Sequence, residues 1–266
     1  MPDNPRHRGR PKGFNDSSDK TRIQALDRAL DVLEVLADQG GLTLSEVAAS
    51  LKQSPATIYR VLTTLQLRGM ADTDPGDQTW HVGPGAFRIG SAFLRRSSVV
   101  ERARPVMRML MEETGETANL GIEKNGQVLF LSQVETHETI RAFFPPGTLS
   151  PMHASGIGKA LLASMDDTRL FGEDDLESFT PKTLTSQSQL RADLALTRDR
   201  GFSFDDEERA EGMRCIAAPI YNLFGEAVAG ISISGPTHRL DTARIQTIGA
   251  LVRDAAHDLS RALGAS

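Results

Sequence analysis

The stretch GLTLSEVAASLKQSPATIYRVLTTLQLR, residues 41–68, contains the start signals of two short helices joined by a tight connection. Thr43 and Glu46 have the T-x-x-E spacing of a capping box, which predicts that a helix begins there. Ser54 can cap a second helix, and Pro55 occupies its first position, where proline is well tolerated. Two short helices in this arrangement indicate a helix-turn-helix, a motif that commonly binds DNA.

The second helix of this motif should turn one face to a core and the other to DNA. Ile58, Leu62 and Leu65 recur at helical spacing and define the core side. The candidate DNA contacts are the two capping residues and the polar residues that point away from this core. They are Thr43, Ser54, Thr57, Tyr59, Arg60 and Thr63. An ordinary helical hairpin with a solvated polar face has the same pattern, but the segments on either side favour DNA binding.

The flanking segments complete a winged helix-turn-helix domain, predicted over residues 21–84. Apolar residues at helical spacing predict a preceding helix over residues 22–39, ended by Gly40 and Gly41. Residues 69–82 contain two strand-like runs around the turn signal Pro75-Gly76, which predicts a β-hairpin wing. We expect Trp80 to pack this wing onto the helices rather than to contact DNA.

The first 20 residues have the composition of a disordered basic arm. They are rich in Pro, Gly, Asp, Asn and Ser and show no apolar period. The G-R-P-K sequence at residues 9–12 resembles an AT-hook, in which Arg8, Arg10 and Lys12 would enter the minor groove of A·T-rich DNA. A basic tail that only aids solubility fits the same residues equally well.

Length and charge distribution indicate a DNA-binding head on a larger acidic body. The chain has 266 residues, which favours two domains. Residues 1–100 carry 13 Lys and Arg against 11 Asp and Glu, whereas residues 101–266 carry 17 against 24. Cys215 is the only cysteine, so no internal disulfide can form, and this fits a reducing cytoplasm. The sequence contains no apolar leader and no run long enough to span a membrane, so we expect a cytoplasmic protein without a membrane partner.

The remaining sequence predicts a linker helix over residues 85–100 and an α+β domain over residues 101–266. Residues 86–96 and 101–114 have helical periodicity, and the first of these should also help dimer contact. Strands are expected at residues 117–123, 127–134, 139–144, 201–204, 215–221 and 228–234. Helices are expected at residues 156–164, 187–200 and 242–263.

Residues 155–159 of this domain, Ser-Gly-Ile-Gly-Lys, open a helix whose free N–H groups suit a carboxylate. Glycines that only permit a tight turn would give the same pattern, and the spacing matches neither a P-loop nor G-x-G-x-x-G. Ser232 and Ser234 alternate with isoleucines, so both hydroxyls should face one side of a strand. Cys215 fits a buried small apolar residue, and Lys159 should lie at the surface or in the first helical turn.

Four longer segments, together with the helix-turn-helix, resemble the IclR family of bacterial transcriptional regulators. They are PMHASGIGKA at residues 151–160, GFSFDDEE at 201–208, GMRCIAAP at 212–219 and ISISGP at 231–236. The resemblance covers residues 22–263 and is strongest to members that sense glyoxylate and pyruvate. It implies a GAF-like effector domain in which Asp205 and Cys215 face the effector. Together with the helix start and the two serine hydroxyls, the candidate effector-binding residues are Ser155, Gly156, Ile157, Asp205, Cys215, Ser232 and Ser234. An acidic run such as the one that begins at Asp205 is otherwise usually a solvated face.

The resemblance also implies a homodimer, or a dimer of dimers, on a pseudo-palindromic DNA operator. Residues 142–146, Ala-Phe-Phe-Pro-Pro, depart from the family in the loop that forms the apolar side of the site, which leaves the exact effector open. We therefore expect a DNA-binding regulator that senses a small 2-oxo acid, glyoxylate first, with another small organic or aromatic acid as the alternative.

Two other classes of function fit the sequence less well. A cysteine enzyme would use Cys215 as its nucleophile, but the sequence has no second cysteine to resolve it and no nearby histidine to act as base. An architectural DNA binder would leave the acidic α+β domain without a role. The six histidines lack metal-site spacing, so we expect no metal, no cofactor and no enzymatic activity.

Overall fold

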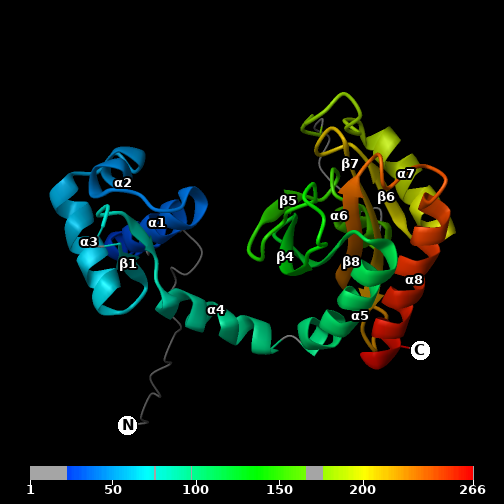
Figure 1. Ribbon diagram of the computed structural model, residues 1–266, viewed down its shortest axis with the longest axis horizontal. Helices are drawn as coiled ribbons and strands as arrows, with labels where there is room; N and C mark the ends of the chain where they lie inside the picture. Colours follow the sequence, from blue (N-terminus) through cyan, green and yellow to red (C-terminus); the bar gives the residue numbers. More distant parts are fainter. Residues whose placement is uncertain (1–22, 75, 97, 166–175, 266) are drawn as a thin grey trace, which may run out of the picture. The chain divides into compact units, whose positions relative to one another are not determined.

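The computed structural model describes residues 23–74, 76–96, 98–165 and 176–265 (Figure 1). The basic arm with Arg8, Arg10 and Lys12, and Pro75 of the predicted wing turn, lie outside the described residues. The chain forms two compact units that divide between Phe93 and Leu94. This division falls inside helix α4 (Pro84–Arg96), the segment predicted as a linker helix.

The N-terminal unit is a winged helix-turn-helix, as predicted. It contains α1 (Gln24–Gln39), α2 (Leu44–Ser50) and α3 (Pro55–Leu67). The wing is an antiparallel pair of β1 (Ala71–Thr73) and β2 (Trp80–Val82). Trp80 is only 8% exposed and joins the helical core, so its predicted packing role is confirmed.

Local hydrogen bonds explain where the two short helices begin. The Thr43 N–H donates to Glu46 Oε2 at 2.8 Å, and the Glu46 N–H donates to Thr43 Oγ1 at 3.4 Å, which is the predicted capping box. Ser54 Oγ accepts from the Thr57 N–H at 3.2 Å, ahead of Pro55 at the first position of α3. These bonds satisfy donors that a helix start otherwise leaves unpaired.

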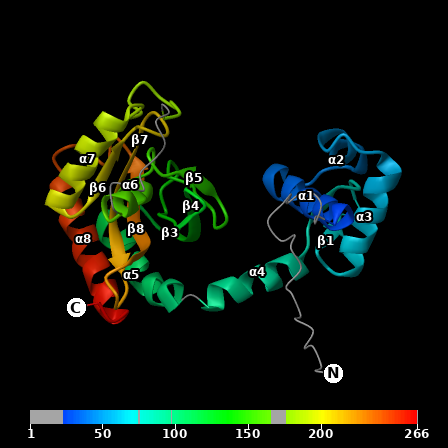
Figure 2. The ribbon, with the colours of Figure 1, turned by 180° about the vertical axis from the view of Figure 1, so that it is seen from behind.

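The C-terminal unit is built on a six-stranded antiparallel sheet in the order β5-β4-β3-β8-β7-β6. The strands are β3 (Thr117–Lys124), β4 (Gln127–Val134), β5 (Leu149–Pro151), β6 (Ser203–Asp206), β7 (Met213–Tyr221) and β8 (Ala227–Pro236). Helices α5 (Ser98–Thr114) and α8 (Ile245–Ala262) cover one face. Helices α6 (Gly156–Ala163) and α7 (Gln187–Arg200) lie on the other face of the sheet (Figures 1 and 2). The predicted α+β class is confirmed.

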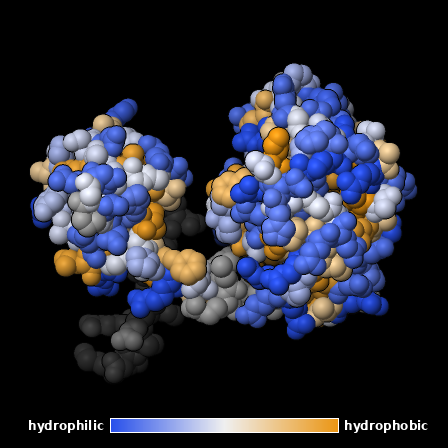
Figure 3. Space-filling model, viewed as in Figure 1, coloured by the Kyte–Doolittle hydropathy of each residue, from blue (hydrophilic) through white to orange (hydrophobic). Residues whose placement is uncertain are grey.

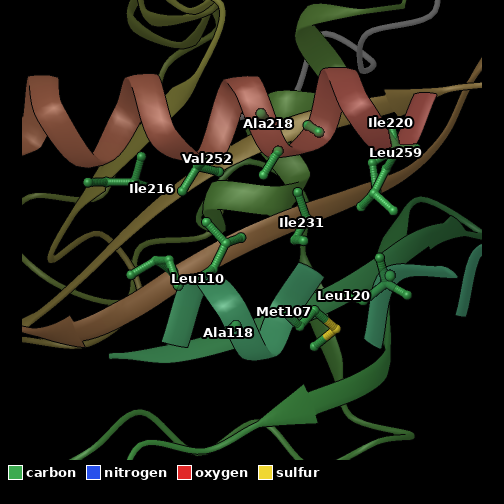
Figure 4. Packing of buried hydrophobic residues seen from close by; sticks show 14 of the residues in the cluster. Met107, Leu110, Ala118, Leu120, Ile216, Ala218, Ile220, Ile231, Val252 and Leu259 are labelled. Carbon is green, nitrogen blue, oxygen red and sulfur yellow. The ribbon is translucent and has the colours of Figure 1, made fainter. Parts of the chain in front are cut away.

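Period-two alternation in the central strands gives the sheet one strongly apolar face. Ile231 on β8 and Ile216 on β7 point to the same side, where they meet Leu110 of α5 and Val252 of α8 (Figure 4). All four are fully buried or nearly so. This apolar cluster packs α5 and α8 against one face, and the polar side chains of the central strands lie on the other face.

One predicted strand is wrong. Residues 139–144 form a loop, and the edge of β4 pairs instead with β5, three residues that follow the Pro145-Pro146-Gly147 turn. The loop carbonyl of Ile140 accepts a hydrogen bond from Arg239 Nη2 at 2.7 Å, so a side chain satisfies a group that a strand neighbour would otherwise pair.

The surface of the larger unit is mainly hydrophilic on the face shown in Figure 3. Apolar residues appear there as scattered small areas, which is usual for a folded domain. None of the described helices combines the length and the apolar composition that crossing a bilayer requires.

Close packing of α8 against the segment before β6 yields a test of the core. Gly249 lies so near the Phe202 ring that a Cβ atom there would be 2.3 Å from Phe202 Cζ. We expect Gly249→Ala to lower the free energy of unfolding by about 1–3 kcal/mol, because the ring is buried and must move. Gly90→Ala in α4 is the control, since a Cβ there meets no atom within 4 Å. Equal effects of the two substitutions in chemical denaturation would contradict this packing.

Candidate functional site

The outer face of helix α3 carries a row of polar side chains with Arg60 near its centre. Tyr59 is 55% exposed and Arg60 is also exposed, whereas Thr57 and Thr63 are half-buried. The Thr63 hydroxyl donates to the Tyr59 carbonyl at 2.8 Å, which leaves it free only to accept a hydrogen bond. At 100° per residue, Thr57 and Tyr59 lie on opposite flanks of Arg60, so Arg60 is best placed to reach a base edge.

A shallow groove between α1 and α3 adds a residue that the sequence analysis missed. Arg28 of α1 lines this groove with Thr57, Arg60 and Thr64 of α3. Two guanidinium groups on neighbouring helices strengthen the positive field that a DNA backbone needs. A lone arginine within an amphipathic helix gave no signal of this in the sequence.

The second candidate site lies on the face of the sheet beneath α6. Cross-strand pairing places Asp205, Cys215, Ser234 and Thr117 side by side in one row across four strands. The next row on the same face contains Ser203, Ala217, Ser232, Asn119 and Gln133. We call these two rows the polar strip. Three of the predicted effector-site residues, Asp205, Cys215 and Ser234, are thus direct neighbours, with Ser232 beside them.

Asn119 organises the middle of the polar strip. Its Nδ2 donates to Ser234 Oγ at 3.2 Å and to Ser232 Oγ at 3.5 Å, and its Oδ1 accepts from Gln133 Nε2 at 2.9 Å. Asn119 and Ser232 are fully buried and Ser234 is 2% exposed. The prediction that both serine hydroxyls face the same side is confirmed. The alternation of Thr117 and Asn119 with Ala118 and Leu120 could have identified Asn119 from sequence.

The start of α6 lies directly on Cys215. A Cβ atom on Gly156 would be 2.6 Å from Cys215 Sγ, so only glycine allows this approach. Burial raises the pKa of Cys215 to about 11, and the negative charge of Asp205 adds to that shift. The Ser234 and Ser232 hydroxyls and the Gly156 N–H favour the thiolate but do not offset the burial. The side chain is therefore a neutral thiol at physiological pH.

The other predicted residues at this helix start have distinct roles. Ser155 caps α6, because its Oγ accepts the Gly158 N–H at 3.4 Å. The Ile157 side chain joins an apolar cluster and would contact a Cβ placed on Gly230, so only its N–H remains a candidate ligand donor. Ser203 donates to the Gly156 carbonyl at 2.6 Å and fixes the helix start on the sheet.

Lys159 is the fourth residue of α6, in agreement with the predicted place at the helix start, but the predicted surface position is wrong because its side chain is fully buried. Its Nζ donates to Glu208 Oε1 at 2.6 Å and to the Phe204 carbonyl at 2.5 Å, and it lies 3.0 Å from Asp193 Oδ2. Burial by itself lowers the pKa of Lys159, but the charges of Glu208 and Asp193 outweigh it and the net shift is upward. Lys159 follows Gly156 by three residues, and its side chain points inward. The carboxylates that it meets, those of Asp193 and Glu208, come 34 and 49 residues later in the sequence.

Two of the carboxyl groups around Lys159, those of Asp205 and Glu208, have raised pKa values. Burial raises the pKa of Asp205 to about 6 and that of Glu208 to about 7, against the opposing charge of Lys159. The Glu208 N–H donates to Asp205 Oδ1 at 2.8 Å. Asp205 is 7% exposed, so the acidic run does not begin on a solvated face. Asp205 connects the polar strip to this buried ionic cluster.

No group of three His, Cys, Asp or Glu side chains suited to hold a metal ion occurs within residues 23–74, 76–96, 98–165 and 176–265. The chemistry of the polar strip is that of hydrogen-bond donors and acceptors. Its hydroxyls, amides, thiol and carboxyl can orient a small polar ligand.

Both parts of the chain match family models. Residues 25–75 match the IclR helix-turn-helix domain, and residues 91–261 match the bacterial transcriptional regulator IclR C-terminal domain. The chain is 58% identical over 261 residues to the HTH-type transcriptional regulator BhcR of Paracoccus denitrificans (strain Pd 1222), covering 96% of this chain and 94% of the relative. It is 38% identical over 266 residues to the transcriptional repressor IclR of Escherichia coli (strain K12), covering 98% and 97%.

A solved structure has the same architecture. The crystal structure of Thermotoga maritima IclR superposes with a TM-score of 0.77 at 26% identity, covering 91% of this chain and 100% of that chain.

The contribution of the buried Lys159 ammonium to stability can be measured by comparison with an exposed lysine, Lys182. Lys159→Met should lower the free energy of unfolding by about 3–5 kcal/mol at pH 7, because it leaves buried carboxylates without a counter-charge. Lys182→Met should cost less than about 1 kcal/mol, because that side chain is 48% exposed and pairs with Asp206 and Glu207 at the surface.

The loss in Lys159→Met should shrink as pH falls through about 7 and then about 6. The raised pKa values of Glu208 and Asp205 mean that both carboxyls take up protons in this range and no longer need the ammonium. Chemical denaturation at pH 5 and pH 7.5 measures this. Equal losses for the two lysine variants would contradict the structural role of the cluster.

Proposed function

Since the chain belongs to the IclR family of bacterial transcriptional regulators, we propose that a small 2-oxo acid, most simply glyoxylate, controls how it binds DNA. Residues 21–84 would bind the operator, residues 85–100 would link, and residues 101–266 would sense the ligand in the cytoplasm. The observation that supports the sensing site best is the polar strip beneath the start of α6.

The size and polarity of the strip favour a short ligand. Its side chains are small and mostly carry hydroxyl, amide, thiol or carboxyl groups, and none is aromatic. The ligand carboxylate would accept the N–H groups of Gly156 and Ile157 at the helix start. Its carbonyl or hydrate end would meet Asp205, Cys215, Ser232 and Ser234. A protonated Asp205 carboxyl can donate a hydrogen bond to a ligand oxygen, which its pKa near 6 makes accessible.

A larger aromatic acid is the second candidate, suggested by the aromatic residues of the loop that follows β4. Phe144 in that loop stacks on Phe130 with ring centroids 4.9 Å apart, and Phe143 is 62% exposed. Neither ring belongs to the polar strip. These contacts support the short oxo acid over the aromatic one.

The cysteine-enzyme alternative conflicts with the chemistry of Cys215. The nucleophilic form of cysteine is the thiolate, and a pKa of about 11 keeps this side chain protonated at neutral pH. The relatives of this chain are transcriptional regulators. A role as a hydrogen-bonding wall of an effector site therefore fits Cys215 better than catalysis.

We propose that the regulator binds a pseudo-palindromic operator as a homodimer or a dimer of dimers. A winged helix reads one half-site, so specific binding needs two heads related by symmetry. Exposed apolar residues support such pairing: Ile23 and Leu26 on the N-terminal side of the head are 68% and 56% exposed, and Phe87 and Ile89 of α4 are 76% and 60% exposed. The arm residues Arg8, Arg10 and Lys12 would add salt-dependent affinity for the DNA backbone.

Arg60→Ala tests the DNA-binding face. If Arg60 reads a base, the substitution should cost about 1–3 kcal/mol of operator affinity and relax specificity at one position. Arg191→Ala, which removes an exposed arginine from α7, is the control and should leave operator affinity unchanged. Binding to operator variants in a mobility-shift assay distinguishes the outcomes. Equal loss on every sequence would make Arg60 a phosphate contact, and no loss would remove it from the interface.

The sensing site is tested by calorimetric titration of the full chain with glyoxylate. A ligand with so few atoms should bind with a Kd on the order of micromolar to millimolar. Ser232→Ala combined with Ser234→Ala should weaken binding at least about tenfold, since two hydrogen-bonding groups are lost. Ser188→Ala on the exposed side of α7 should not. Unchanged glyoxylate binding in the double variant would place the ligand elsewhere. Absence of glyoxylate binding, together with benzoate binding that the double variant abolishes, would favour the aromatic alternative.

The same titration should depend on pH through Asp205. Burial raises its pKa, the charge of Lys159 opposes this shift, and the nearby carboxylates of Asp206 and Asp193 add to it. Because the protonated carboxyl tolerates an anionic ligand better, glyoxylate should bind more tightly at pH 5.5 than at pH 7.5. Asp205→Asn should remove most of this difference while keeping an acceptor for the Glu208 N–H. A pH dependence identical in this variant would show that another group titrates.

A further inference from the structure

A second cavity lies at the opposite end of α6 from the polar strip. Its volume is about 350 Å³, and it is lined by the last turns of α6, α7 and α8 around the end of β7. Eight helical residues separate the two ends of α6 by about 12 Å. No residue of the proposed effector site lines this cavity.

The cavity is basic although the chain as a whole is acidic. Arg198, Arg253, Arg261 and His257 line it, and none of the lining residues that the structure describes is an Asp or a Glu. The chain carries a net charge of −5. Among the described residues, Arg253 and Arg261 form ion pairs only with exposed aspartates of their own helix, Asp254 and Asp258. Such pairs are weak enough for an anion to compete.

Two contacts position the guanidinium groups around the cavity. Arg198 Nε donates to the carbonyl of Ala163 at the end of α6, at 2.7 Å. The stem of Arg253 lies across Gly201, where a Cβ atom would be 2.7 Å from Arg253 Cδ. Gly201 is the C-cap of α7 and has a φ of +78°. Both this left-handed conformation and the close approach of Arg253 therefore favour glycine at this position.

The cavity lining contains a buried hydroxyl, that of Thr197. Thr197 is 2% exposed, and its Oγ1 makes no hydrogen bond within the part of the chain that the structure describes. A buried hydroxyl without a partner is unfavourable, and a ligand oxygen would satisfy it. The nearby Tyr221 and Ser164 hydroxyls bond to each other at 2.8 Å. The remaining wall is largely apolar and includes Ala218, Pro219 and Leu223.

We propose that this cavity is a second small-molecule site that binds an organic monocarboxylate with a small apolar body. The carboxylate meets the arginines and the Thr197 hydroxyl, and the body packs against the alanine, proline and leucine wall. The volume is in the range of ordinary ligand sites, and apolar walls with a few convergent polar groups are their usual composition. The site is independent of the one proposed for the 2-oxo acid, since the two share no residue.

Benzoate is a suitable probe, with benzamide as its uncharged counterpart of similar shape. In calorimetric titration of the full chain, benzoate should bind with a Kd below about 10 mM, and benzamide at least about tenfold more weakly. Thr197→Val, which conserves shape, should weaken benzoate binding about threefold to tenfold. Arg253→Gln should weaken it about tenfold, whereas Arg191→Gln, elsewhere on α7, should leave it unchanged.

The effector-site variant separates the two sites. Ser232→Ala with Ser234→Ala should bind benzoate as well as the unmodified chain, whatever its effect on glyoxylate. Loss of benzoate binding in that variant but not in Thr197→Val and Arg253→Gln would overturn the second site. Absence of benzoate binding at about 10 mM, or equal binding of benzamide, would also overturn it. Circular dichroism of each variant confirms that the fold is retained, and Arg253→Gln, at an exposed side chain, keeps the test valid if Thr197→Val is unstable.

Discussion

The buried ammonium of Lys159 is the interaction on which the sensing half of this protein depends. It joins α6 to α7 through Asp193, to β6 through the Phe204 carbonyl, and to the segment after β6 through Glu208. An ammonium removed from water is costly unless its partners are close and hydrogen-bonded, and here they are within 3.0 Å. The arrangement of α6 over the sheet is therefore not a matter of apolar packing alone, because moving the helix would leave a buried charge without a partner.

This fixed position of α6 is what makes the polar strip a site. Two glycines allow the helix start to approach the sheet, since a Cβ on Gly156 would collide with Cys215 and a Cβ on Gly158 would be 2.2 Å from the Met152 carbonyl. The opposite face of the sheet is closed by the apolar cluster of α5 and α8. The polar strip thus lies on one face only, where Asp205 connects it to the ionic cluster. A ligand that changes the charge of Asp205 acts on the same electrostatic balance that holds α6, α7 and β6 together.

Regulation requires that the ligand bind differently to DNA-competent and DNA-incompetent arrangements of the dimer. The ionic cluster offers a physical basis for such a difference, since a small shift in one charge alters several contacts at once. Helix α4 runs through the division between the two units and is the covalent connection along which a change must be transmitted. In the second cavity, the ends of α6, α7 and α8 converge, so a ligand there would act on the same helices from their other ends.

The sequence by itself determined the local features of this protein. Capping residues such as Thr43 and Ser54 fixed the helix starts, because their hydrogen bonds span only three residues. Alternation placed Ser232 and Ser234 on one face, and long motifs identified the family. Only the tertiary structure decided the rest. It brought Lys159 to Glu208, Asn119 to Ser234 and Arg198 to Ala163, and it replaced the strand expected at residues 139–144 with a loop held by Arg239. These pairs are 35 to 115 residues apart along the chain, and a buried charge or hydroxyl selects its partner by proximity in the folded state, which local sequence patterns do not encode.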